Sequence, residues 1–139
     1  MDIEFLGCTL QLYNTYLYCL KMLKPFPIHA EIFAEFQNLM PQVTLLRQMQ
    51  SLLDPQRSDI HTMVDLLDQG AEQAQRSAHQ LKGACLVMGF TSMADILTRI
   101  EYASMQQDHA VPIALREQLF CAANETRLAV ANLLVHKAT

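Results

Sequence analysis

The sequence has no tryptophan and only four glycines and five prolines in 139 residues. Its β-branched residues are sparse and scattered, which argues against an extended sheet. Leucine, alanine, glutamine and methionine, which favour helices, are plentiful. The composition therefore predicts an all-α protein. The length favours one domain, large enough to bury a core without disulfides or a metal.

Basic runs are also missing, and the net charge is −4 with histidine neutral. A nucleic-acid-binding protein usually carries a basic surface that displaces counterions from phosphates, so we exclude that class. No pair of cysteines has CxxC spacing. The four cysteines lie among apolar residues, which is typical of reduced, buried thiols in a cytoplasmic protein: Cys8, Cys19, Cys85 and Cys121.

No apolar stretch is long enough to span a bilayer. Asp2 and Glu4 stand where a secretory signal would carry positive charge. Residues 5–23 are rather apolar but are interrupted by polar side chains. We interpret them as a helix covered by protein, because a membrane-surface helix would carry more basic residues on its polar face. We therefore expect a cytoplasmic protein with no membrane partner.

Proline, glycine and apolar spacing divide the chain into helical segments. Pro41 should kink or split the second of them, and Asp54 with Pro55 is a typical helix start. Ser92 and Asp95 have the spacing of a variant capping box. In chain order, the predicted segments cover about residues 3–23, 28–53, 55–69, 71–88, 92–106 and 112–136.

Short connections between successive helices are typical of antiparallel neighbours. We therefore predict an up-down antiparallel four-helix bundle over about residues 55–137, with additional N-terminal helices across one end or side. The predicted organisation is an N-terminal helical extension, residues 1–27, and a bundle domain, residues 28–139.

The helix predicted over residues 71–88 has one apolar stripe and one unusual polar face. Residues of the stripe recur at spacings of three and four: Ala71, Ala74, Ala78, Leu81, Cys85 and Met88. His79 lies about 130° from the centre of this stripe and should face solvent. One turn away on either side are Gln75, Arg76, Lys82 and Gly83.

The segment from Ala78 to Cys85, Ala-His-Gln-Leu-Lys-Gly-Ala-Cys, followed by Gly89, resembles the signature of histidine-containing phosphotransfer (HPt) domains. Residues 93–101 also fit that family, with an acidic residue after an apolar stripe. The resemblance covers about residues 55–105. It implies a phosphorelay carrier that passes a phosphoryl group between the receiver domains of a hybrid sensor histidine kinase and a response regulator.

The resemblance also implies a role for each residue of the motif. His79 would be the phosphoacceptor, Lys82 would steady the phosphoryl group with help from Arg76, and Gly83 would let a partner approach closely. Glu101 would form a hydrogen bond with the second imidazole nitrogen of His79. Three further residues would contribute to partner docking: Gln75, Gln80 and Leu86.

No cofactor is expected, because Mg²⁺ would be supplied by the partner receiver domain. The sequence has no glycine-rich phosphate loop, so we expect a phosphocarrier without a kinase or ATP site of its own. The other histidines lack paired metal-ligand spacing, so no metal site is expected. The resemblance further implies a monomer.

Several alternatives remain open. The chain could be an HPt-like adaptor that binds and sequesters a response regulator without being phosphorylated, or one module of a larger sensor kinase. Arg76 could be an ordinary solvated arginine and Glu101 an ordinary exposed carboxylate.

Overall fold

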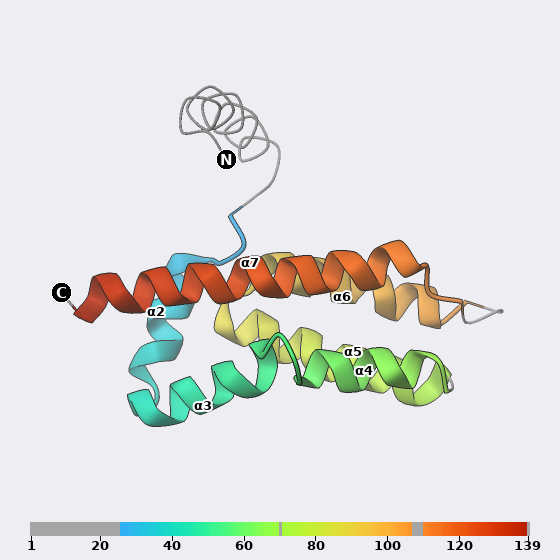
Figure 1. Ribbon diagram of the computed structural model, residues 1–139. Coiled ribbons are helices and arrows are strands. Elements are labelled where there is room, and N and C mark those ends of the chain that lie inside the picture. The colour runs from blue at the N-terminus through green and yellow to red at the C-terminus, as the bar shows by residue number, and fades with distance from the viewer. Residues whose placement is uncertain (1–25, 70, 107–109, 139) are drawn as a thin grey trace, which may run out of the picture.

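A computed structural model describes residues 26–69, 71–106 and 110–138. The described residues form helices and no strands (Figure 1), which confirms the predicted all-α class. In chain order the helices are α2 (Ala30–Asn38), α3 (Gln42–Leu53), α4 (Asp59–Leu67), α5 (Ala71–Met88), α6 (Thr91–Ser104) and α7 (Ile113–Ala138).

The last four helices form the predicted up-down bundle. Helix α5 packs most extensively against α6, α4 packs on α5, and α6 packs on α7. Helix α7 is longer than its neighbours and extends past the bundle to reach α3 (Figure 1). Helix α2 packs against α5 at one end of the bundle, so this part of the N-terminal third lies where we expected it.

One apolar core joins the bundle to the helices that precede it. Phe33 of α2 and Phe90, at the start of α6, are 1% and 0% exposed, and their ring centroids lie 5.9 Å apart. Burying one such side chain contributes about 1.5–3 kcal/mol. The bundle helices supply most of the other fully buried apolar side chains: Ile60, Met63, Met93, Leu97, Ile100 and Leu119.

Gly89 ends α5 because only glycine fits there. Its φ is +79°, in the left-handed region that side chains disfavour. A Cβ at this position would lie 2.8 Å from the carbonyl oxygen of His29. The His29 amide donates to the Gly89 carbonyl oxygen at 2.7 Å. The glycine thus lets α2 approach the turn between α5 and α6.

Two predicted helix boundaries hold in the structure. Pro41 splits the second predicted segment into α2 and α3, and stands as the N-cap of α3 with a φ of −61°. Its ring removes the amide hydrogen that a continuous helix would need. The prediction that α5 covers residues 71–88 is also confirmed.

Two other predicted helix starts are wrong. Asp54 follows the end of α3, and its carboxylate accepts hydrogen bonds from the amides of Gln56 and Arg57 in a local turn. Helix α4 begins later, with Ser58 as its N-cap. Helix α6 begins at Thr91, after Phe90, and has no side-chain cap, so the proposed Ser92 capping box is absent.

The predicted helix over residues 3–23 lies outside the described residues. None of the helices that the structure does describe is long and apolar enough to cross a membrane.

Candidate functional site

The site lies between α5 and α6, the two helices that pack most extensively against each other. Ala74 and Ala78 of α5 are fully buried, and such small side chains let two helices approach. Leu97 and Ile100 of α6 are also fully buried. Glu101 follows Ile100 by about 100° around α6. The same packing therefore places the Glu101 carboxylate at the edge of the core, facing α5.

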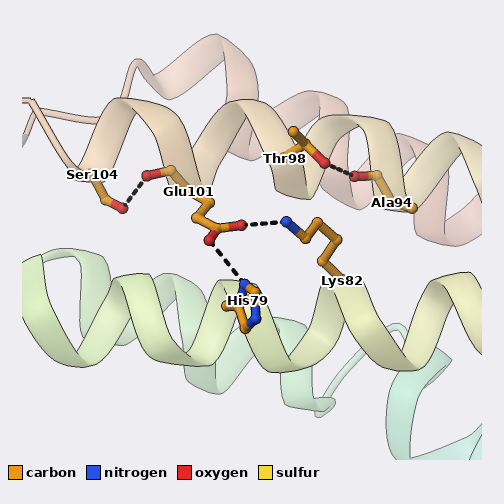
Figure 2. A network of polar contacts seen from close by, with 6 residues as sticks. All are labelled: His79, Lys82, Ala94, Thr98, Glu101 and Ser104. Atoms are coloured by element: carbon orange, nitrogen blue, oxygen red, sulfur yellow. Dashed lines mark hydrogen bonds and ion pairs between the residues drawn. The ribbon is translucent and has the colours of Figure 1, made fainter.

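His79 projects from the exposed side of α5 toward this carboxylate (Figure 2). Its imidazole Nδ1 lies 2.9 Å from Oε1 of Glu101, and its side chain is 67% exposed. The Glu101 side chain is only 16% exposed. The histidine is thus anchored at one ring nitrogen while most of the ring faces solvent.

Lys82 reaches the other oxygen of the same carboxylate. Its Nζ donates to Oε2 of Glu101 at 2.8 Å, and the lysine side chain is 22% exposed. The hydrogen bond from Lys82 lowers the pKa of Glu101 below its ordinary value, and the bond from His79 lowers that pKa further, against the opposing effect of desolvation. Glu101 is therefore ionised at neutral pH.

An ionised carboxylate can only accept hydrogen bonds. The nitrogen of His79 that faces Glu101 must therefore carry the ring proton, which assigns the neutral imidazole as the Nδ1–H tautomer. The lone pair then lies on Nε2. Chemically, the arrangement presents an oriented, exposed nitrogen nucleophile beside an ammonium group and a glycine.

The surface around His79 is open. A Cβ built on Gly83 meets no other atom within 4 Å. Gln80 is exposed and Gln75 is half-buried. Leu86 is 53% exposed and follows His79 by seven residues, nearly two helical turns, so it lies on the same side of α5.

The sequence profile of the Hpt domain family matches residues 31–134, which is most of the chain. The chain therefore belongs to the Hpt domain family. Membership gives it a phosphotransfer role in the phosphorelays of two-component signalling, as a phosphocarrier rather than a kinase. Hpt domains generally interact with histidine kinases and receiver domains. No curated protein and no solved structure matches the chain significantly.

The two arginines nearest the motif of this Hpt domain bind elsewhere. Arg76 pairs with Glu72 at 2.9 Å, and both side chains are more than 70% exposed. Arg99 pairs with Asp95 at 3.2 Å along α6. Such exposed pairs within one helix contribute about 0.3–0.5 kcal/mol and are easily exchanged. The structure therefore does not bring Arg76 into contact with His79.

Some features of the site were not anticipated from the sequence. The Glu101–Lys82 ion pair is one, because the family resemblance predicts a role for Lys82 only at the phosphoryl group. Tyr102 of α6 and Met105, the C-cap residue of α6, are also exposed. Met105 follows Glu101 by four residues, a spacing that places both on one helix face. This spacing is the sequence signal that could have indicated Met105.

The buried cysteine near the site takes no part in its chemistry. The Cys85 thiol is fully buried, and desolvation raises its pKa to about 12, so it is neither a nucleophile nor a metal ligand. Within the parts of the chain that the structure describes, no three histidine, cysteine or acidic side chains gather as a metal site would require.

Proposed function

We propose that this Hpt domain carries a phosphoryl group on Nε2 of His79 and relays it between receiver-domain aspartates. The observation that carries the proposal is the hydrogen bond of 2.9 Å between Nδ1 of His79 and the ionised carboxylate of Glu101. It supports Nε2 as the nucleophile, because the lone pair lies there and the side chain is 67% exposed.

The transfer exchanges one bond to phosphorus for another. The Nε2 lone pair attacks the phosphorus of an aspartyl phosphate on the donor receiver domain. A P–N bond forms, the P–O bond to the aspartate breaks, and its electron pair stays with the aspartate carboxylate. Transfer to the next receiver reverses these steps: the P–N electron pair returns to Nε2 while the proton stays on Nδ1.

Other residues of the motif would support this exchange from the docking side. Lys82 would offset the charge of the phosphoryl group, which brings about two negative charges. Arg76 could join it after leaving its exposed partner. Gly83 would leave space for the partner's active site, and Leu86 would add an apolar contact of the kind found at the centre of interfaces. Two polar residues would complete the docking surface: Gln75 and Gln80.

The proposal is tested by incubating the protein with a phosphorylated hybrid kinase that contains a receiver domain. We expect the wild type to gain an acid-labile, base-stable phosphoryl group. His79→Gln should gain none, while His29→Gln, at the exposed N-cap histidine of α2, should gain the label like the wild type. An unlabelled wild type that nevertheless binds receivers tightly would indicate a sequestering adaptor instead.

A further inference from the structure

The ion pair between Lys82 and Glu101 points to a regulatory property of the same site. Glu101 uses one oxygen for each partner, at 2.9 Å from His79 and 2.8 Å from Lys82. The carboxylate and the ammonium are 16% and 22% exposed, so water screens their attraction less than it screens a surface pair. In the unphosphorylated protein, the lysine is thus already bound to an anion.

Phosphorylation places a second anion beside this pair. A phosphoryl group on Nε2 of His79 would lie one helical turn from Lys82 on the same helix, within reach of its four-carbon side chain. The lysine carries a single positive charge. Arg76 and Arg99 pair with Glu72 and Asp95, so Lys82 is the cation that already contacts Glu101 before phosphorylation. The phosphoryl group and the Glu101 carboxylate would therefore compete for Lys82.

We propose that Glu101 is a positioning residue that shortens the lifetime of phosphorylated His79 by retaining Lys82. This inference rests on the proposed function. When Lys82 stays with the carboxylate, the phosphoryl group lacks its counterion and leaves more readily. On hydrolysis the P–N bond breaks, its electron pair returns to Nε2, and a water oxygen bonds to phosphorus and releases its proton. On onward transfer, the aspartate oxygen takes the place of water.

The test measures the half-life of the phosphohistidine at fixed pH and salt, after phosphorylation by phosphoramidate, a small donor that needs no partner protein. His79→Gln gives the background from other histidines. Glu101→Gln keeps an acceptor oxygen for His79 but loses the charge that holds Lys82. We expect Glu101→Gln to lengthen the half-life of the phosphohistidine about threefold to tenfold. This factor is typical of one partly exposed, charge-assisted hydrogen bond, here from the released Lys82 to the phosphoryl group.

A double-mutant cycle shows whether Glu101 acts through Lys82. On a Lys82→Met background, the factor produced by Glu101→Gln should fall to less than half its value in the presence of Lys82. Equal factors in both backgrounds, or no lengthening at all, would overturn the inference. Asp95→Asn is the matched control, because it also removes an ion-paired carboxylate from α6, and it should leave the half-life unchanged.

A spectroscopic readout separates this role from a purely structural one. The ¹⁵N resonance of the Lys82 ammonium should shift more on phosphorylation in Glu101→Gln than in the wild type, because the carboxylate no longer competes. Equal shifts in both proteins would contradict the competition.

The two proposals fail in different ways. A wild type that reacts with phosphoramidate but accepts nothing from any receiver would refute the relay function, while the half-lives would still test the competition. Normal relay with unchanged half-lives would refute the competition alone.

Discussion

Replacing Gly83 by alanine should stabilise the fold and slow phosphotransfer at the same time. Gly83 lies in the interior of α5, where glycine is about 1 kcal/mol less favourable than alanine. The added methyl group meets nothing within 4 Å, so no steric cost offsets this gain. We expect the free energy of unfolding to rise by about 0.5–1 kcal/mol, which raises the melting temperature by about 2–4 °C for a domain of this size.

The same methyl group should obstruct a partner that docks over Gly83. Overpacking a close contact by one methyl group costs about 1–3 kcal/mol, which corresponds to roughly 5- to 150-fold slower transfer at limiting partner concentration. Urea unfolding measures the first effect, and the rate of label transfer from a phosphorylated receiver measures the second. A Gly83→Ala variant that is more stable but transfers label at the wild-type rate would refute docking over Gly83. A variant with no gain in stability would refute the claim that glycine destabilises the interior of α5.

Alanine at Gly89 is the matched comparison and should have the opposite effect on stability. The positive φ and the contact of 2.8 Å with the His29 carbonyl oxygen should cost about 1–3 kcal/mol, measured by the same urea unfolding. A stabilised Gly89→Ala variant would show that α2 does not approach this turn.

Three further predictions concern stability and reactivity. The lowered pKa of Glu101 contributes stability that is complete above the unfolded-state pKa, about 4.3, and is lost as pH falls through the lower folded-state pKa. The difference in free energy of unfolding between wild type and Glu101→Gln should therefore shrink in acid. A difference that does not change with pH would contradict this prediction. Ser58→Ala removes the N-cap of α4 and should lower the free energy of unfolding by about 1 kcal/mol in urea titrations. Alkylation of the native protein, followed by mass spectrometry, should label the exposed Cys121 and leave the buried Cys85 unmodified. Alkylation of Cys85 without unfolding would contradict its burial.

The helix that carries the site could be predicted because its sequence combines several consistent signals. An apolar stripe at spacings of three and four, a glycine at its end and a small-residue contact face all agree on one position for α5. That register alone places His79 toward solvent. The Hpt signature then adds the phosphotransfer chemistry, which periodicity by itself does not contain.

The residues at which helices start were harder to predict, because one sequence pattern is compatible with two local structures. An aspartate can accept hydrogen bonds from the amides two and three residues ahead either in a turn or at a helix N-cap. Asp54 makes the turn, and Ser58 makes the cap. Ser58 lacks the usual sequence signal of a capping box, because its partner is His61 instead of glutamate or glutamine.

The partner of Lys82 could not be predicted from sequence for a related reason. A lysine side chain is long and flexible, so it can reach a phosphoryl group beside its own helix or a carboxylate on the next. Only the packing of α6 against α5 decides that the Glu101 carboxylate lies 2.8 Å from the Lys82 ammonium. The resemblance connected Glu101 to His79 but gave no sign that the same carboxylate also binds Lys82.

The most direct test of the central claim is to identify the nitrogen that becomes phosphorylated. Protein labelled with ¹⁵N-histidine would be phosphorylated by its cognate receiver, and the ³¹P–¹⁵N coupling would be assigned by NMR. The account predicts a single phosphoramidate bond at Nε2 of His79, with Nδ1 still protonated against Glu101. Phosphate on Nδ1 of His79, or on another histidine, would contradict the account.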